Sequence, residues 1–498
     1  MIHTSLPTSL YRAAQTREMD RIAIEEGHIP GQELMERAGS AAFSLMCDLW
    51  PQARNIVIVC GNGNNGGDGF VVARRAQQAA WRVRVLVIAP NERFSPTAHL
   101  AAESLKKIGV EWEEFSPTAL AGADLIVDAI LGTGLIRPVI GLWQQAIESI
   151  NLAVIPVFSL DIPSGLHADT GCVLGHAIQA QATLTFIGIK QGLLTAAGPD
   201  HCGKLYYDDL RLSPALFTAI KPAALRLTHP DLALPRRQRC AHKGDHGRVL
   251  IIGGDQGMGG AVIMAALAAL RSGAGLVKIA TQVDYAAGMS IAYPEIMAYG
   301  IQKVTDIDAL VANTDVIAFG PGLGQSEWSR QLFKHILPQK IPMVVDADGL
   351  NLLAVFKLRQ NNWILTPHPG EAARLLNINS AQIQADRFTA VTKLQAEYGG
   401  VVVLKGVGTL ICDAQVNIYL CDCGNPGMAT AGMGDVLCGV ITGLLAQGLD
   451  ATQAAYKGVL IHALAGDEAA ALHGERGLTA LDLLFPIRRW VNEIHANP

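Results

Sequence analysis

The sequence predicts an α/β protein with two domains, each built on a parallel β-sheet. Runs of β-branched residues alternate with helical patterns along nearly all of the 498 residues, an order typical of parallel sheets. Half of the residues are hydrophobic, only 17% are charged and 51 are glycine, which suits a compact enzyme and excludes a disordered chain. Prolines interrupt the pattern between Leu212 and about His242, and we therefore place the domain boundary near residue 220.

The first domain, residues 1–220, opens with two amphipathic helical stretches at about residues 13–27 and 32–46. Its strands are expected at residues 55–60, 83–89, 123–130, 153–162 and 182–188. The second domain, residues 221–498, has expected strands at residues 248–254, 276–281, 314–322, 341–349, 362–368 and 400–406. Because ligands of open α/β sheets bind beyond the carboxyl ends of the strands, the residues at those ends are the candidates for function.

The bulk properties favour small-molecule chemistry in the cytoplasm. A net charge of −5 gives no electrostatic reason to expect a nucleic acid or an anionic membrane as partner. The first residues lack the pattern of a signal peptide, and the longest apolar stretches are shorter than a membrane span. The nine cysteines are scattered without metal-ligand spacing, as expected of reduced thiols. The apolar N-terminal helix pair also leads us to expect a homo-oligomer.

The stretch GNGNNGGD, residues 61–68, has the glycine spacing of a dinucleotide-binding turn. In that motif a carboxylate at the end of the second strand binds the ribose, but here the strand ends in Ala89 and Pro90. Asp68 is expected at the helix start, where a capping carboxylate would repel a phosphate. The stretch therefore does not predict an ordinary redox-cofactor site.

Polar side chains follow several strands of the first domain. Asp128, Asp161 and Ser164 come at strand ends, and Lys190 follows a further strand. Carboxylates gathered at one edge are costly unless a positive charge lies among them. Oxygen ligands from Asn65, Asp128 and Ser164 would suit a monovalent or hard divalent cation. The alternative is that Asp128 and Asp161 only cap the helices and loops that follow them.

Three long motifs, GNGNNGGDGFVVAR, DAILGTGLIRPV and LDIPSGLHADTG, resemble the N-terminal epimerase domain of the NAD(P)H-hydrate repair proteins, over about residues 10–215. His167 departs from the family, which more often has an acidic residue there. The resemblance implies a Rossmann-like sheet with helices on both faces, and a potassium ion held by Asn65, Asp128 and Ser164. It assigns the hydrated substrate to Asn64, Asn65, Gly66, Gly67, Asp68, Gly132, Thr133, Gly134, Leu135, Ile136, Arg137, Pro138 and Asp161.

Epimerisation of such a substrate requires proton transfer and no redox partner. The hydroxyl lies on the carbon next to the ring nitrogen, so the nitrogen lone pair helps hydroxide to leave and to return on the other face. We expect Asp161 to supply the acid–base group, assisted by Lys190.

In the second domain, Gly432, Met433, Gly434 and Asp435 form a glycine-rich turn ahead of a long apolar helix. Backbone amides at such a helix start bind anions, and the aspartate can take a proton from a hydroxyl that attacks a phosphoryl group. This arrangement is typical of the ribokinase-like fold. Asp346 and Asp348 are candidates for the outer shell of a magnesium ion or for structural caps, and His462 is expected in the core.

Together with LTPHPGEAARLL and VVVLKGVGTLI, this turn looks like the C-terminal dehydratase domain of the same repair proteins, over roughly residues 230–490. Ala431 stands where members often have glycine. The resemblance implies Mg²⁺ and, for chains that fuse both domains, ADP as phosphoryl donor. It assigns the hydrated dinucleotide to Ala261, Gly324, His368 and Asp435. It assigns the adenine nucleotide to Lys405, Gly406, Val407, Gly408, Thr409 and Gly434.

The sequence thus predicts a bifunctional enzyme that epimerises hydrated NAD(P)H in its first domain and dehydrates one epimer in its second, with Asp161, Lys190 and Asp435 as catalytic residues. One alternative is a ribokinase-like kinase for a small alcohol with a nucleotide-sensing first domain. Another is that the first domain is a binding module without catalytic activity.

Overall fold

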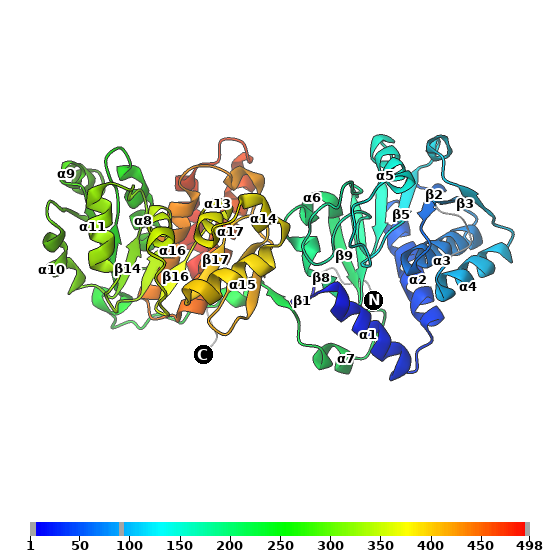
Figure 1. Cartoon of the computed structure of the whole chain (residues 1–498), viewed down its shortest axis with the longest axis horizontal. Coiled ribbons are helices and arrows are strands. Elements are labelled where there is room, and N and C mark those ends of the chain that lie inside the picture. The colour runs from blue at the N-terminus through cyan, green and yellow to red at the C-terminus, as the bar shows by residue number, and fades with distance from the viewer. Residues whose placement is uncertain (1–5, 89–93, 494–498) are drawn as a thin grey trace. The chain divides into compact units, whose positions relative to one another are not determined.

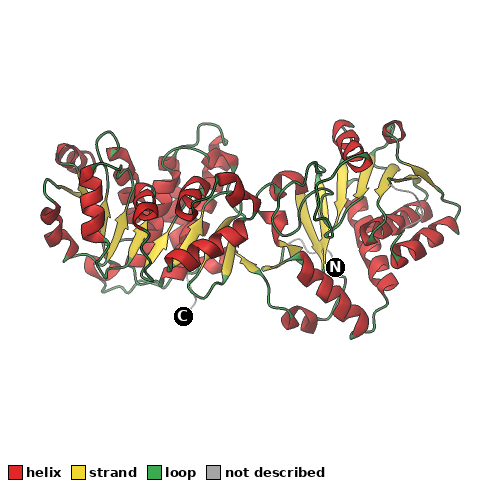
Figure 2. Cartoon of the chain, viewed as in Figure 1, coloured by secondary structure: helices red, strands yellow, loops and turns green. Residues whose placement is uncertain are grey.

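The computed structural model describes residues 6–88 and 94–493, and the chain divides into two compact units, Met1–Leu225 and Arg226–Pro498 (Figure 1). Each unit has a sheet of mainly parallel strands with helices packed against it (Figure 2), which confirms the predicted α/β class. The expected strand end at Ala89 and Pro90 lies outside the described residues. No helix in the described part of the chain has the length and apolar character needed to cross a membrane.

The first unit contains a seven-stranded parallel sheet in the order β4-β3-β2-β5-β6-β7-β9. All five expected strands are present, although most are shorter than expected, and β4 and β9 are additional. The central strands of the sheet are buried, because helices cover both of its faces, whereas the edge strand β4 is largely exposed. They are β2 (Asn55–Cys60), β3 (Arg82–Val87), β4 (Trp112–Glu114), β5 (Leu125–Ala129), β6 (Val157–Leu160), β7 (Ala182–Phe186) and β9 (Lys204–Asp208).

Alternate residues of β2 pack into two separate cores. Ile56 and Ile58 face a core shared with the second and third helices, whereas Val57 and Val59 face a core shared with the fifth. The helices of this unit are α1 (Ala13–Glu25), α2 (Gly31–Leu49), α3 (Asn64–Gln78), α4 (Pro96–Lys106), α5 (Leu142–Leu152), α6 (Gly198–Cys202) and α7 (Pro214–Ala219).

A short strand fixes the N-terminal helix against the first unit. In β1 (Ser9–Tyr11), Tyr11 lies opposite Lys190 of the parallel strand β8 (Ile189–Lys190), and β10 (Ala224–Arg226) pairs with β1 from the other side. The backbone N–H of Ala13, the first residue of α1, donates to Asp169 Oδ1 at 2.6 Å. These contacts hold the start of α1 beside β8.

The second unit contains seven parallel strands in the order β13-β12-β11-β14-β15-β16-β17, followed by the antiparallel strands β18 and β19. All six expected strands are present. The strands are β11 (Arg248–Ile252), β12 (Leu276–Thr281), β13 (Met297–Gly300), β14 (Val316–Phe319), β15 (Met343–Val345), β16 (Trp363–Leu365), β17 (Val401–Leu404), β18 (Thr409–Cys412) and β19 (Ile418–Cys421).

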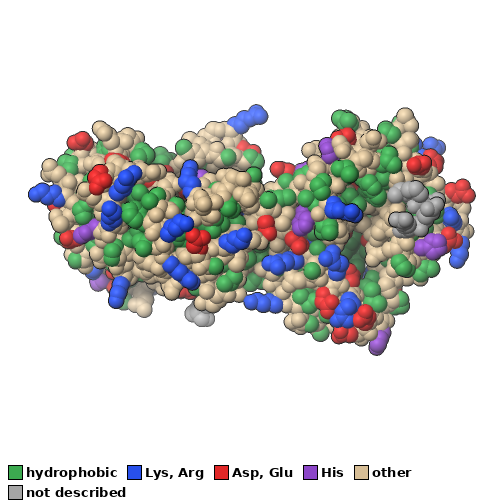
Figure 3. Space-filling model, viewed as in Figure 1, with side chains coloured by type: hydrophobic (Ala, Val, Ile, Leu, Met, Phe, Trp, Pro, Cys, Tyr) green, Lys and Arg blue, Asp and Glu red, His purple; other side chains and the backbone are tan. Residues whose placement is uncertain are grey.

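Glycines let two buried helices of the second unit approach closely. A Cβ on Gly439 would lie 2.1 Å from the carbonyl oxygen of Ala265, so only glycine fits this contact. The helices are α8 (Gly259–Ser272), α9 (Val283–Ala292), α10 (Asp308–Val311), α11 (Glu327–Ile336), α12 (Asp348–Phe356), α13 (Pro369–Leu376), α14 (Ser380–Ala385), α15 (Arg387–Tyr398), α16 (Met433–Ala446), α17 (Ala451–His473) and α18 (Leu484–Glu493). On the face drawn in Figure 3, basic and acidic side chains are interspersed on both units.

Candidate active sites

The first unit has a cavity of about 740 Å³ beyond the carboxyl ends of its central strands. Most of the expected substrate residues line it, namely Asn64, Asn65, Asp68, Gly132, Thr133, Gly134, Leu135, Ile136, Arg137 and Asp161. Gly66 and Gly67 do not line it but allow close packing, because a Cβ would meet the Gly61 carbonyl oxygen at 1.9 Å and the Met35 side chain at 2.4 Å respectively. Pro138 is also outside the lining.

An ion pair between Asp161 and Lys190 lies in this cavity. Asp161 directly follows β6 with φ +65°, a left-handed conformation that is uncommon outside glycine, asparagine and aspartate. Its Oδ1 accepts hydrogen bonds from Lys190 Nζ, from Thr185 Oγ1 at 3.3 Å and from the Phe186 N–H at 3.2 Å. The buried Lys190 ammonium also donates to Thr185 Oγ1 and to the Phe186 carbonyl. The pair is therefore held in one geometry.

Two further carboxyl groups line the cavity, Asp20 of α1 and Asp68 of α3, and neither has a hydrogen-bond or ion-pair partner among the described residues. Burial raises the pKa of Asp20 to about 6; Lys190 opposes this shift and Asp161 adds to it. Burial, with Asp161 and Asp20, raises the pKa of Asp68 well above its ordinary value.

The expected capping role of Asp68 is wrong, because Gly63 caps α3 and Asp68 lies in the second turn. Asp20 was not among the expected site residues. The helical spacing could have indicated it, because Asp20 lies four residues after Thr16 and next to Met19. Both of these residues are buried on the inward face of α1.

The three expected cation ligands, Asn65, Asp128 and Ser164, lie together. Asn65 Nδ2 donates to the Leu131 carbonyl at 3.2 Å, and Ser164 Oγ lies 3.2 Å from the same carbonyl oxygen. The Ser164 hydroxyl donates its one hydrogen to Asp128 Oδ1 at 2.5 Å. Asn65 Oδ1 is buried and has no hydrogen-bond partner among the described residues, as expected of an oxygen that would ligate a cation. The described residues contain no group of three histidine, cysteine or acidic side chains that could hold a metal ion. The amide, carboxylate and hydroxyl oxygens of Asn65, Asp128 and Ser164 are ligands that suit a hard cation.

Asp128 itself accepts four hydrogen bonds from protein donors. Its Oδ2 accepts from Ser159 Oγ at 2.8 Å and from the Ser164 N–H at 2.9 Å, and its Oδ1 accepts from Ser164 Oγ and the Ile130 N–H. Burial still raises its pKa above the ordinary value, although these hydrogen bonds lower it in part. Asp128 therefore shapes the loops after β5 and β6 as well as supplying charge.

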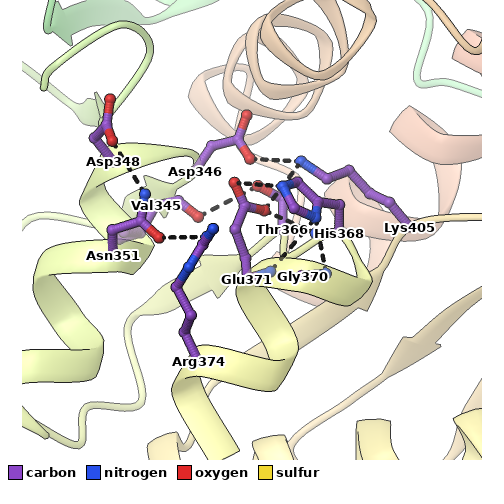
Figure 4. A network of polar contacts seen from close by, with 10 residues as sticks. All are labelled: Val345, Asp346, Asp348, Asn351, Thr366, His368, Gly370, Glu371, Arg374 and Lys405. Carbon is purple, nitrogen blue, oxygen red and sulfur yellow. Dashed lines mark hydrogen bonds and ion pairs between the residues drawn. The ribbon is translucent and has the colours of Figure 1, made fainter. Parts of the chain in front are cut away.

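In the second unit, a polar network joins the ends of β15, β16 and β17 (Figure 4). Lys405 Nζ donates to Asp346 Oδ1 at 2.8 Å and lies 3.7 Å from Glu371 Oε2. Burial alone would lower the pKa of Lys405, but the carboxylates of Asp346 and Glu371 outweigh it and raise that pKa. Burial raises the pKa of Glu371 to about 7; Lys405 opposes this shift and Asp346 adds to it. His368 caps α13, since its Nδ1 accepts from the Gly370 N–H at 2.9 Å.

The glycine-rich turn of the second unit forms the start of α16. Gly432 has φ +89° and precedes Gly434 and Asp435, whose N–H groups have no backbone partner among the described residues. A Cβ on Gly434 would lie 3.3 Å from Lys405 Nζ and 3.7 Å from Asp346 Oδ2. Burial, then Asp346, raises the pKa of Asp435 to about 7, although Lys405 lowers it. This helix start, with free amides, an ammonium and a carboxyl group of raised pKa, can hold an anion and take a proton.

The expected nucleotide loop, residues 405–409, joins β17 to β18 and contains Gly406 at φ +130° and Gly408 at φ +64°. Arg387, a residue that the sequence did not single out, is buried beneath this loop. Its Nη2 donates to the carbonyls of Leu404 at 3.2 Å, Lys405 at 3.3 Å and Gly408 at 3.4 Å. The buried guanidinium of Arg387 thus holds the loop in its conformation through these three hydrogen bonds.

The remaining expected residues lie on adjoining loops. A Cβ on Gly322 would lie 2.9 Å from the Cβ of Ala261, and the Gly324 N–H donates to Asp348 Oδ2 at 2.9 Å. Because Asp348 Oδ1 also accepts from Asn351, its role here is structural. His462 is buried on α17, where burial lowers its pKa to about 4.

Comparison with known protein families matches both units. Residues 31–192 match the family described as the YjeF-related protein N-terminus, and residues 249–489 match the family described as NAD(P)H-hydrate dehydratase.

Full-length relatives and a solved structure agree with these two family matches. The chain is 46% identical over 487 residues to a bifunctional NAD(P)H-hydrate repair enzyme of Coxiella burnetii, a match that covers 97% of this chain and all of that protein. A protein of the same description from Escherichia coli is 42% identical, over 98% of this chain and 95% of its own. A ribokinase-like superfamily protein of Enterococcus faecalis is 29% identical, with a TM-score of 0.51 over 54% of this chain and 96% of its own. These matches confirm the resemblances seen in the sequence.

Proposed function

The chain belongs to the family of bifunctional NAD(P)H-hydrate repair enzymes, and we propose that its two units carry the two activities on separate sites. The first unit epimerises hydrated NADH and NADPH, and the second dehydrates one epimer at the expense of a nucleotide. Both activities on one chain are useful because the epimer that the second site rejects returns through the first. The observation that carries this proposal is the pair of lysine–aspartate sites, one at the carboxyl edge of each sheet.

In the first unit, we assign proton transfer to Asp161, oriented by Lys190. The lysine and two further donors hold Asp161 Oδ1, which leaves Oδ2 for the substrate. The free N–H groups of the first turn of α3 would receive the pyrophosphate of the dinucleotide. The loop 132–138 would cover the ring.

Potassium is the cation that we propose for Asn65, Asp128 and Ser164. The buried Asn65 Oδ1, to which no residue in the described part of the chain donates, supports this proposal. The ion would supply fixed positive charge beside the loop that binds the substrate. Exchange of K⁺ for Na⁺ or tetramethylammonium at constant ionic strength should lower both the epimerase rate and the melting temperature. Equal values in all three salts would contradict the assignment.

In the second unit, Asp435 would take the proton from the ring hydroxyl as that oxygen attacks the terminal phosphoryl group of the nucleotide. The free amides of α16 and Lys405 would stabilise the transferred phosphoryl group. Phosphate is a better leaving group than hydroxide, so its loss restores the double bond. Residues 405–409 and Gly434 would hold the nucleotide, for which we expect ADP, and Ala261, Gly324, His368 and Asp435 would contact the hydrated dinucleotide.

Magnesium would supply charge neutralisation for the nucleotide phosphates. Asp346 is suited to hold it, because its Oδ2 has no partner among the described residues and lies near Gly434. Asp348, which holds Gly324 and Asn351, is not proposed as a ligand.

The deciding experiment mixes purified protein with both epimers of hydrated NADH, magnesium and either ADP or ATP, and follows the dihydronicotinamide absorbance to completion. Full recovery with one nucleotide would support both activities and identify the donor. If the absorbance recovers only to the level that one epimer accounts for, the epimerase assignment is refuted and the dehydratase assignment remains. No recovery, with a stable phosphorylated alcohol formed from another substrate, would favour a kinase.

Two further expectations belong with this proposal. The cytoplasm, where the pyridine nucleotides are turned over, is the location that we propose. The homo-oligomer expected from the N-terminal helices is to be tested by light scattering of the purified chain.

A further inference from the structure

Helix α1 forms one wall of the cavity in the first unit, although it precedes the part of the chain, residues 31–192, that matches the family model. Thr16, Arg17 and Asp20 line the cavity from this helix. The pairing of Tyr11 with Lys190 and the contact of Ala13 with Asp169 fix its start. Nη1 of Arg17 reaches the Thr133 carbonyl at 3.4 Å, so α1 also contacts the loop expected to cover the substrate.

Asp20 is the acidic residue that this wall presents to the cavity. It faces the charged groups of Arg17 on its own helix, Asp68 on α3, Arg137 on the substrate loop, Asp161 after β6 and Lys190 on β8. Lys190 is already engaged by Asp161, Thr185 and Phe186, and no described residue pairs with Asp20. A carboxyl group that is largely withdrawn from water without a partner lowers stability, so its presence in a cavity indicates a function.

We propose that Asp20 is a second catalytic residue of the epimerase, the acid that protonates the departing hydroxyl, while Asp161 accepts the proton of the incoming water. This assignment rests on the proposed epimerase function of the first unit. The two carboxyl groups suit different roles because their surroundings differ. Asp161 has an ammonium and two further donors on one oxygen, whereas no donor among the described residues reaches Asp20.

The proposed steps conserve atoms and electrons. Asp20 gives its proton to the ring hydroxyl as the carbon–oxygen bond breaks, the bonding pair leaves with the oxygen as water, and the lone pair of the ring nitrogen forms a carbon–nitrogen double bond. Water then adds to the opposite face of that carbon, the double-bond pair returns to the nitrogen, and Asp161 takes the released proton. Proton exchange with water restores Asp20 to its acid form and Asp161 to its base form.

The test compares the full-length wild type with Asp20→Asn and with Asp48→Asn, a matched control on the exposed face of α2. Epimer exchange is measured on a single purified epimer without nucleotide, and dehydration is measured separately. We expect Asp20→Asn to lower kcat/KM for exchange about 100-fold. Its dehydration rate should stay unchanged and its melting temperature should be no lower than that of the wild type. Asp20→Glu, which keeps an ionisable group, should recover part of the exchange.

The pH profile separates a catalytic role from a structural one. The acid form is the active form, so wild-type kcat/KM should fall as pH rises above the pKa of Asp20, about 6 in the free protein. The Asp20→Asn variant should no longer show this fall of kcat/KM with rising pH. The Asp68→Asn variant should still show it, even with weaker binding of the hydrated dinucleotide. Loss of this fall in Asp68→Asn alone would overturn the proposal, as would normal exchange by Asp20→Asn. Reduced exchange together with a lower melting temperature would make Asp20 structural. A wild type without any exchange would instead refute the epimerase itself.

Discussion

The two units each place a lysine against an aspartate at the carboxyl edge of a parallel sheet, yet Lys190 is buried and Lys405 is only partly buried. Lys190 contacts Asp161, Thr185 and the Phe186 carbonyl, all fixed parts of its own unit. Lys405 has one close partner, Asp346, and lies beside the free amides of α16. The first lysine can therefore only orient a carboxylate, whereas the second is free to turn toward a phosphoryl group.

The loops around the two lysines differ in the same sense. The first cavity is rich in carboxyl groups and amide oxygens, which suit proton transfer and a cation. The second site is built on glycines, at Gly406, Gly408 and Gly432, whose positive φ values bring backbone N–H groups toward a ligand. Under the proposed function, the same α/β edge would serve acid–base chemistry in one unit and phosphoryl transfer in the other.

Asp435→Asn is the substitution from which we expect the largest effect on one activity and none on the other. The substitution removes the proposed base at the start of α16, and we expect kcat for dehydration to fall roughly 1,000-fold. Epimer exchange in the same preparation should be unchanged. Asp308→Asn, an exposed carboxylate paired with His335, is the matched control for loss of charge. A dehydration rate within threefold of the wild-type rate would show that Asp435 is not the catalytic base.

Asp161→Asn should produce the complementary result, with exchange of a purified epimer slowed about 100- to 1,000-fold. Asparagine keeps the shape of the side chain but lacks the charge that Lys190 stabilises, so Lys190→Met should have a smaller effect in the same direction. Dehydration should remain at the wild-type rate with the reactive epimer. If both activities fell together, the two units would not be independent.

The strands, the strand-end residues and the glycine turns were predictable from the sequence, because each depends on a local pattern. Buried β-branched runs give strands, and parallel topology brings Asp161 and Lys190 to one edge. The short or polar strands, such as β4 and β9, were not predicted, since their hydrophobic signal is weak.

Asp20 and Arg387 were missed for a different reason. Each reaches its site through contacts that are distant in sequence, such as the pairing of Tyr11 with Lys190 and the hydrogen bond from Arg387 to the Gly408 carbonyl. An acidic or basic residue on a helix is usually solvated, so a single sequence gives no reason to expect burial. Asp68 was predicted as a cap because its distance from the helix start was misjudged by one turn.

The pH dependence of dehydration tests the second site further. Asp435 must be ionised to accept a proton, and its pKa is raised to about 7. The rate should therefore fall about tenfold per pH unit as pH decreases below 7, measured as kcat/KM at saturating nucleotide. Glu371 also has a pKa of about 7, so Glu371→Gln is the control and should keep this limb. A limb that disappears in Glu371→Gln would assign the base to that residue instead.

We expect the smallest effect, on the KM for the nucleotide, from a change beneath the loop of residues 405–409 in the second site. Arg387→Lys keeps a buried positive charge but cannot reach the carbonyls of Leu404, Lys405 and Gly408 with one planar group. We expect the KM for the nucleotide to rise about tenfold with kcat changed less than twofold, because the loop is proposed to bind the nucleotide and to take no part in proton transfer. Lysine is preferred to methionine, since each buried carbonyl left without a partner costs about 1–3 kcal/mol and threatens folding. Arg271→Lys, on the exposed side of α8, is the matched control. An equal fall in kcat and kcat/KM would mean that Arg387 acts on the transition state, and the loop would then belong to the catalytic site and not only to the binding site.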